Sequence, residues 1–322
     1  MALLVYVDII SAGNDSHACS KFKAYLDACF SIKDLGPLKC FLGIEVSRGP
    51  KALFLSQRKY ALEIVDECGL LGSKPCPFPI EENYKLALAA GPPLTDARRY
   101  RPLVGRLIYL TITRPDLCYA VHILSQFMQN PRDEHMHAAS RVLRYVKGTP
   151  DCGILLQANQ GLQLSAYCDY DWGACPLTRR SLTGYLVTLG GSHISWKTKK
   201  QSTVSRSSTE AEHRSMAAAT SELVWLIYFL ASLGIFHSQA MQLFCDSQAA
   251  LHIARNPLFH ERTKHIEIDC HFVCEHYHSG DLSLSYVPSR LQPADIFTKA
   301  LGTRQFRYLQ SKLGMVSFHD LT

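Results

Sequence analysis

The sequence predicts an α/β protein whose second half is a mixed sheet flanked by helices, preceded by a smaller α+β region. Residues 163–169 alternate apolar and polar side chains with the period of a strand. Strand-like segments 182–189 and 192–196 follow and are joined at Gly190-Gly191, a turn signal. Helical and strand-like segments then alternate, which is the order expected of a sheet with helices on its faces.

The remaining elements follow from periodicity and from chain breakers. In the first half we expect strands at 3–9, 40–47 and 52–55, helices at 16–30 and 58–68, a proline-rich linker at 70–96, and helices from 98 to 147. In the second half we expect helices at 209–233, 247–255, 263–278 and from about 293, with strands at 241–245 and 282–287. The predicted regions are therefore 1–96, 97–160 and 161–322.

Composition indicates a folded protein with a modest preference for anionic partners. Hydrophobic residues make up 47% and charged residues 19% of the 322 residues, and the formal net charge is +6. The first residues lack a basic start, and no run of about 18 apolar residues occurs, so neither a signal peptide nor a membrane span is expected. The protein is expected to be intracellular, cytoplasmic or particle-associated.

The twelve cysteines are scattered singly and form no CxxC pair, which favours reduced thiols. The densest group of possible zinc ligands is Cys270, His271, Cys274, His276 and His278. These residues would crowd one short helix without a distant second pair, which argues against a structural zinc site.

Four acids lie where a two-metal nuclease needs them. Asp169 ends the first strand of the second half, Glu212 lies in the first turn of the long helix, Asp246 follows a short strand, and Asp295 opens the last helix. Clustered carboxylates repel one another, and two Mg²⁺ ions about 4 Å apart would remove that cost. Mn²⁺ is an alternative ion.

Each acid also fits a structural role. Asp169 could be a surface acid at a strand end, Asp246 a helix N-cap, and Asp295 a favourable charge at a helix N-terminus. Thr209 and Glu212 together have the spacing of a capping box. Asp171 is expected beyond the strand end, and Glu210 on another face of the helix.

The local sequences around the acids resemble the ribonuclease H domain of copia-type retrotransposon Pol polyproteins. The motifs occur in order at 167–172 (YCDYDW), 180–185 (RSLTGY), 194–201 (ISWKTKKQ), 207–212 (SSTEAE), 245–250 (CDSQAA), 256–268 (NPLFHERTKHIEI) and 294–299 (ADIFTK). By this resemblance Asp169, Glu212, Asp246 and Asp295 are catalytic and bind the metal ions. The implied fold is a ribonuclease H-like mixed sheet.

Basic residues near these motifs are candidates for phosphate contacts, which are insensitive to base sequence and sensitive to salt. They are Lys197, Lys199, Lys200, Arg206, His260, Arg262, Lys264, His265, Arg141, Arg144 and Lys147. A solvated basic turn at 197–206 and a packed helix entry at 260–265 remain alternatives.

The first half resembles a truncated copia-type reverse transcriptase. Its motifs lie at 30–36 (FSIKDLG), 41–46 (FLGIEV), 55–60 (LSQRKY), 100–105 (YRPLVG), 113–116 (TRPD) and 141–149 (RVLRYVKGT), which implies a primer-gripping hairpin at 40–56 and a thumb and connection after it. Tyr6 and Asp8 resemble the catalytic Tyr-x-Asp-Asp turn, but Ile9 takes the place of the second aspartate. The rest of the polymerase is expected to lie before residue 1, so no DNA synthesis is expected.

The sequence therefore predicts an enzyme that hydrolyses the RNA strand of RNA–DNA hybrids, fused to an inactive reverse transcriptase remnant. The alternative is a catalytically silent remnant that binds nucleic acid.

Overall fold

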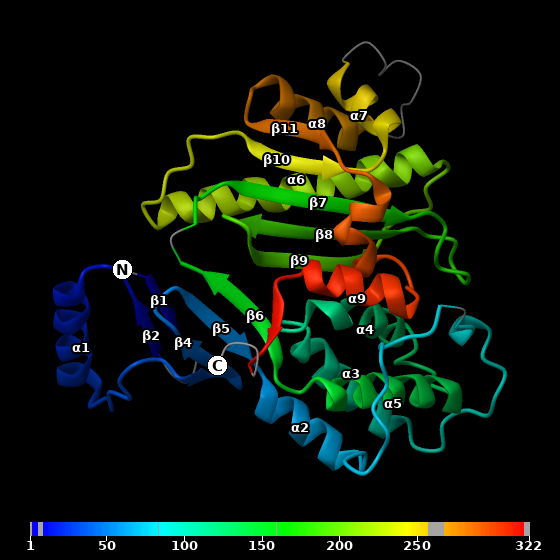
Figure 1. Cartoon of the computed structure of the whole chain (residues 1–322), viewed down its shortest axis with the longest axis horizontal. Coiled ribbons are helices and arrows are strands. Elements are labelled where there is room, and N and C mark those ends of the chain that lie inside the picture. The colour runs from blue at the N-terminus through cyan, green and yellow to red at the C-terminus, as the bar shows by residue number, and fades with distance from the viewer. Residues whose placement is uncertain (1, 6–8, 83, 159, 257–266, 319–322) are drawn as a thin grey trace.

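A five-stranded mixed sheet forms the centre of the second half in the computed structural model (Figure 1). The structure describes residues 2–5, 9–82, 84–158, 160–256 and 267–318. The sheet has the order β11-β10-β7-β8-β9. Its strands are β7 (Leu164–Asp171), β8 (Leu182–Leu189), β9 (Ser192–Lys200), β10 (Met241–Cys245) and β11 (Leu282–Tyr286).

The strand directions bring two of the predicted site residues to one end of the sheet. β10 runs parallel to both β7 and β11, whereas β8 runs antiparallel to β7 and β9. The carboxyl ends of β7 and β10 therefore lie at the same edge, at the right in Figure 1. This topology confirms the predicted ribonuclease H-like mixed sheet.

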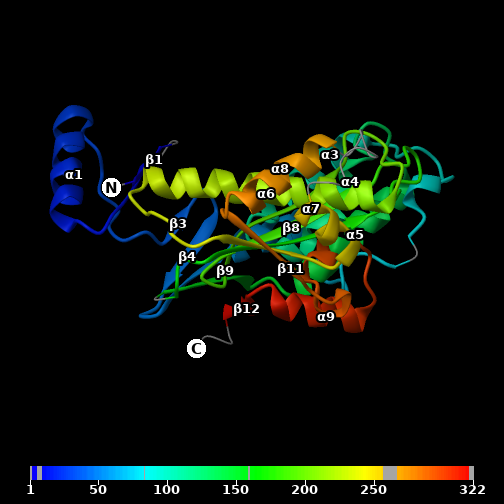
Figure 2. The same cartoon turned by 90° about the horizontal axis from the view of Figure 1, so that it is seen from above.

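Helices cover one face of the sheet, and the view in Figure 2 separates the layers. These helices are α6 (Ser208–Ser232), α7 (Gln248–Arg255) and α8 (Glu267–His278). Leu164, Ala166 and Cys168 of β7 point into this layer and pack with Leu223 of α6. By length and hydropathy α6 is the one described helix that could cross a membrane. Its apolar face instead packs on β7 and β8, as in a core helix.

The opposite face of the sheet packs on the C-terminal segment and on helices of the first half. The C-terminal part consists of the 3₁₀ helix η5 (Pro293–Phe297) and α9 (Thr303–Lys312). The helices of the first half are α2 (Arg58–Glu67), α3 (Ala97–Leu110), α4 (Cys118–Ser125) and α5 (Asp133–Gly148), with short 3₁₀ turns η1 (Leu86–Leu88) and η2 (Pro115–Leu117). Leu182 and Leu186 of β8 share one hydrophobic core with this layer.

A buried ion pair anchors the helical layer. Arg114 and Asp116 are each 1% exposed, and the guanidinium Nη2 lies 2.9 Å from the carboxylate Oδ2. The hydroxyl of Tyr145 in α5 donates to the same Asp116 oxygen, and Gln310 of α9 donates to that hydroxyl at 2.7 Å. The pair therefore links the first-half helices to the C-terminal helix.

The first half contributes a second sheet, of order β12-β6-β5-β4-β3, which the sequence predicted only in part. Its strands are β3 (Cys40–Phe41), β4 (Ile44–Arg48), β5 (Ala52–Ser56), β6 (Cys152–Gln157) and β12 (Met315–Ser317). The last two were not predicted, and they pair here although they lie far along the chain. The predicted single strand at 40–47 is wrong, because Leu42 and Gly43 have positive φ and form a tight turn.

The N-terminal elements lie at the far edge of the molecule (Figures 1 and 2). They are β1 (Ala2–Val5), β2 (Ile9–Ala12) and α1 (Ser16–Phe30), and α1 buries none of its residues. The helix predicted from about 293 is also wrong as one element. The 3₁₀ turn ends at Phe297, the next residue Thr298 is held to the sheet, and α9 begins only at Thr303.

Candidate functional site

Elements distant in the sequence bring the four predicted acids to one end of the sheet. Asp169 lies on β7, and Asp246 directly follows β10 on the neighbouring parallel strand. Glu212 comes from the second turn of α6, which crosses β7, and Asp295 from η5, which packs against β7 and β8.

Asp169 and Asp295 share one ammonium group. Lys299 Nζ lies 3.2 Å from Asp169 Oδ1 and 2.8 Å from Asp295 Oδ1. The Thr298 hydroxyl donates to the other oxygen of Asp169. Since Asp169 is 1% and Asp295 4% exposed, these contacts replace part of the solvation that burial removes.

A glycine permits the approach of η5 to the sheet. A Cβ at Gly184 of β8 would lie 2.7 Å from Thr298 Cγ2, 2.8 Å from Phe297 Cβ and 3.3 Å from the Ala294 carbonyl oxygen. Gly184 is also the direct cross-strand partner of Asp169. The glycine of the RSLTGY motif therefore creates the space in which Asp295 reaches Asp169.

Two hydrogen bonds fix η5 in that position. The buried Gln292 side chain donates from Nε2 to the Cys168 carbonyl at 2.9 Å. On the other side, Thr198 of β9 donates from its hydroxyl to the Phe297 carbonyl at 2.8 Å. The segment that carries Asp295 is thus held to both β7 and β9.

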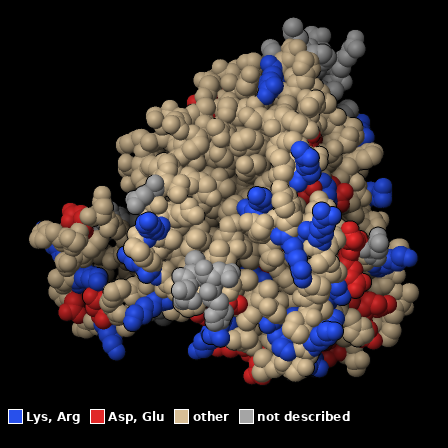
Figure 3. Space-filling view, viewed as in Figure 1, with Lys and Arg blue, Asp and Glu red and all other residues tan. Residues whose placement is uncertain are grey.

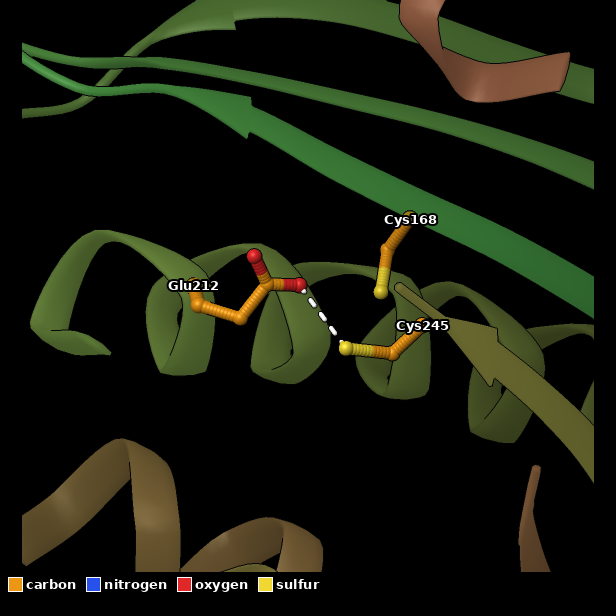
Figure 4. Close-up of side chains that lie close together, drawn as sticks. All are labelled: Cys168, Glu212 and Cys245. Carbon is orange, nitrogen blue, oxygen red and sulfur yellow. Dashed lines mark hydrogen bonds between the residues drawn. The ribbon is translucent and has the colours of Figure 1, made fainter. Parts of the chain in front are cut away.

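Glu212 is fully buried and turns toward two thiols (Figure 4). The Cys245 thiol donates to Glu212 Oε1 at 3.0 Å, and no described residue hydrogen-bonds Oε2.

The predicted capping box of Thr209 and Glu212 is wrong. Ser207 is the N-cap and accepts from the Glu210 amide, while Glu210 accepts from the Arg206 amide. Glu212 is therefore free of any capping role.

Asp246 is not the N-cap of α7, since Ser247 occupies that position and accepts from the Ala250 amide. The Asp246 carboxylate instead accepts from the Ser289 hydroxyl at 2.7 Å.

Asp171 lies within β7, paired with Leu182, so its expected position beyond the strand end is wrong. Burial raises the pKa of Asp171, and Lys299 opposes this rise.

The acids interact electrostatically. Burial raises the pKa of Asp169 to about 7, the charges of Asp295 and Asp246 add to the rise, and Lys299 and Thr298 oppose it. Burial also raises the pKa of Glu212, as do Cys245, Asp169 and Asp246. Although burial disfavours an ammonium group, Asp169 and Asp295 hold the pKa of Lys299 above its ordinary value. The acids are therefore close enough to destabilise one another's charged forms.

This donor set suits hard divalent cations, which prefer carboxylate oxygens. When ionised, these acids carry more negative charge than Lys299 neutralises, so added positive charge would stabilise their ionised forms. The four acids are not packed around one point. Within the described residues, the one group of three or more ligand-type side chains whose donor atoms all lie within 4.8 Å is Cys168, Glu212 and Cys245.

The predicted basic contacts lie in several places. Lys197 and Lys199 are exposed on β9 and, with Lys200 and Arg214, line a polar groove beside α6. Lys200 donates to Gln126, and Arg206 is exposed ahead of α6. His260, Arg262, Lys264 and His265 lie outside the described residues, as do Tyr6 and Asp8.

The three basic residues of α5 are partly occupied by contacts or burial within the protein itself. Arg141 pairs with Glu81 at 2.7 Å and stacks on Phe78, and Lys147 donates to the Ser73 carbonyl. Arg144 is half-buried. In Figure 3 the Lys and Arg side chains are spread over the lower and right parts of the face and form no single stripe.

Sequence reasoning missed the residues that organise the acids: Lys299, Thr298, Gln292 and Gly184. The spacing of Asp295 and Lys299, four residues apart, was a usable signal, because such pairs meet on one face of a helical turn. The contact of Gly184 with η5 depends on the tertiary fold, and no local pattern indicates it.

Comparisons with known proteins identify relatives of this chain. The family described as "Reverse transcriptase (RNA-dependent DNA polymerase)" matches residues 1–82. The retrovirus-related Pol polyprotein from transposon RE1 of Arabidopsis thaliana is 44% identical over 97% of this chain and 21% of its own length. The putative transposon Ty5-1 protein YCL074W of Saccharomyces cerevisiae is 31% identical over 69% of this chain and 73% of its own length. Ribonuclease H1 from Halobacterium salinarum aligns over 42% of this chain and 94% of its own, with 16% identity and a TM-score of 0.31.

The sheet order and the acidic end of the sheet define a ribonuclease H-like domain joined to a reverse transcriptase-like region. The chain belongs to the retrovirus-related Pol polyproteins of transposons, which confirms the resemblance to the copia-type family. It spans about a fifth of the length of the RE1 polyprotein.

We expect Gly184→Ala to destabilise the protein by about 1–3 kcal/mol, because the new methyl group would push η5 away from β8. Urea denaturation measures the change. Gly105→Ala is the matched control. Gly105 lies within α3, and a Cβ there would meet nothing within 4 Å, so the substitution should stabilise by about 0.5–1 kcal/mol. Equal effects of the two substitutions would contradict the close approach of η5.

We also expect the stability of the metal-free protein to fall as pH rises from about 4 to about 7. Asp169 has a pKa of about 7 in the folded chain against 3.8 ordinarily, so the folded state binds more protons across this window. Denaturation in a chelating buffer at several pH values measures the slope, which Asp169→Asn should flatten. An unchanged slope in that variant would rule out Asp169 as its source.

Proposed function

We propose that this chain is a ribonuclease that hydrolyses the RNA strand of RNA–DNA hybrids. Asp169, Glu212, Asp246 and Asp295 would hold two Mg²⁺ ions, with Mn²⁺ as an alternative. The observation that carries the proposal is the placement of acids from β7, α6 and η5 with Asp246 at one end of the sheet, where they raise one another's pKa values. Two ions about 4 Å apart would also suit donors that are spread over more than one point.

The protein's own residues would prepare the site. Thr298 and Lys299 orient the Asp169 carboxylate, and Gln292 and Gly184 set the distance between Asp169 and Asp295. When bound, the metal ions would supply Lewis acidity for in-line attack of water on the phosphodiester and for departure of the 3′ oxygen. The products would be 5′-phosphate and 3′-hydroxyl ends.

Basic side chains on the same sheet as Asp169 support a nucleic-acid partner. Lys197 and Lys199 are exposed on the edge strand β9, where they could neutralise backbone phosphates. We propose that contacts to 2′-hydroxyls on one strand select the hybrid, since the 2′-hydroxyl distinguishes RNA from DNA.

A specific observation favours the rival function, a catalytically silent protein that binds nucleic acid. Glu212 bonds to the Cys245 thiol, and Lys299 already bridges Asp169 and Asp295. If these contacts resist metal ions, the chain would bind hybrid without cutting it.

Cleavage of a labelled RNA–DNA hybrid in Mg²⁺ separates the two functions. We expect the parent chain to cut the RNA strand and Asp246→Asn to lose more than about 100-fold of that rate, because a proposed metal ligand is removed. Glu275→Gln, a change of an exposed acid on α8, is the control and should keep the parent rate. Hybrid binding without cleavage by all three proteins would favour the silent remnant.

We further propose that the first half does not synthesise DNA. Ile9 stands where the resemblance places the second metal-binding aspartate, and it cannot coordinate an ion. A primer-extension assay with this chain should give no templated incorporation, and incorporation above a no-enzyme control would refute the proposal.

A further inference from the structure

Two thiols and a carboxylate converge behind the acidic cluster, within the core between the sheet and α6 (Figure 4). Cys168 lies on β7 and Cys245 on the adjacent parallel strand β10. The register pairs Phe244 with Tyr167, so the next residues along the two strands, Cys245 and Cys168, are neighbours. Glu212 faces them from α6, and the donor atoms of all three residues lie within 4.8 Å of one another.

These distances match the needs of a tetrahedral thiolate site. Zinc–sulfur bonds of about 2.3 Å at the tetrahedral angle place two sulfur ligands about 3.8 Å apart. A carboxylate oxygen at about 2.0–2.2 Å completes a set of three protein ligands, and the fourth position takes water. Soft thiolates select zinc-like ions over Mg²⁺, which prefers oxygen ligands. The site is therefore chemically distinct from the acidic cluster.

An unpartnered buried atom points to a missing ligand. Glu212 has no exposed surface, and no described residue hydrogen-bonds its Oε2. Its Oε1 receives the Cys245 thiol proton at 3.0 Å, while Cys168 makes a long contact of 3.7 Å to the Phe244 carbonyl oxygen and also contacts the Cys245 thiol. A bound cation would satisfy the carboxylate and both sulfurs, and the two thiol protons would pass to the solvent.

The position of this group links it to the acidic cluster. Cys168 directly precedes Asp169, and Cys245 directly precedes Asp246. Because side chains alternate along a strand, Cys168 points toward α6 while Asp169 points to the opposite face, where Thr298 and Lys299 bind it. Glu212 is the residue common to the thiols and to the acids.

We propose that Cys168, Cys245 and Glu212 form a binding site for a thiophilic divalent cation such as Zn²⁺ or Cd²⁺. An ion in this site holds the Glu212 carboxylate on the thiol side and withdraws it from the Mg²⁺ site. Occupancy therefore inhibits cleavage of the hybrid, a consequence that rests on the proposed nuclease function.

The test uses the full chain and Cd²⁺ alone, because cadmium–thiolate bonds absorb in the ultraviolet and report binding without any nuclease activity. We expect the parent chain to develop this band with the first equivalent of Cd²⁺, and Cys168→Ser/Cys245→Ser to lose it. Cys270→Ser/Cys274→Ser is the matched control. In the parent chain these two buried thiols lie 3.9 Å apart on α8, without a carboxylate in the group. They are therefore not expected to bind the first equivalent of Cd²⁺, and the variant that lacks them should keep the band.

A second variant tests the site even if the double serine protein fails to fold. Glu212→Gln keeps both thiols and should weaken Cd²⁺ binding by about 10-fold or more, with circular dichroism unchanged. A first-equivalent band that survives in Cys168→Ser/Cys245→Ser, or its absence from the parent chain, would overturn the proposed site.

The inhibition is measured separately, as the ratio of each protein's cleavage rate in Mg²⁺ with and without Cd²⁺. We expect strong inhibition of the parent chain and at least about 10-fold weaker inhibition of the double serine variant. Equal inhibition of both would overturn the link to Glu212. Absence of cleavage by the parent chain would defeat the nuclease proposal, while the absorption band would still decide whether the cation site exists.

Discussion

Repulsion among carboxylates at the carboxyl ends of β7 and β10 is the main energetic cost that the fold of this domain has to offset. Burial and mutual repulsion raise the pKa values of Asp169, Asp295 and Glu212 together. The fold offsets part of this cost with Lys299, whose ammonium group lies between Asp169 and Asp295. Additional positive charge would stabilise the ionised form of these acids, and divalent cations would supply it.

The rest of the structure serves to hold that arrangement. Gly184 admits η5 to the sheet, and Gln292 and Thr198 fix it there. The segment then continues into α9, which packs on the helices of the first half, and Gln310 joins the buried network of Arg114 and Asp116. β12 finally pairs with β6 in the first-half sheet. The two halves thus share one hydrophobic core, one buried hydrogen-bond network and one sheet.

The sequence predicted the elements whose signals are local. The strand 182–189, the strand 241–245 and the helix 16–30 were each predicted at their observed bounds, because periodicity and breakers determine them. Long-range pairing was not predictable in this way: β6 becomes a strand because it pairs with the distant β5, and β12 because it pairs with β6 of the first half. The four acids were found through motifs, whereas Lys299, Gly184 and the thiol neighbours of Glu212 depend on contacts that exist only in the folded chain. The roles of the acids and of the basic residues stay predictions.

The most direct test of the central claim is a calorimetric titration of the full chain with Mn²⁺, which binds carboxylate sites as Mg²⁺ does. If the four acids form one site, single substitutions Asp169→Asn, Glu212→Gln, Asp246→Asn and Asp295→Asn should each weaken the same binding event by about 10-fold or more. Binding of Mn²⁺ that is unaffected by any of the four would contradict a shared metal site.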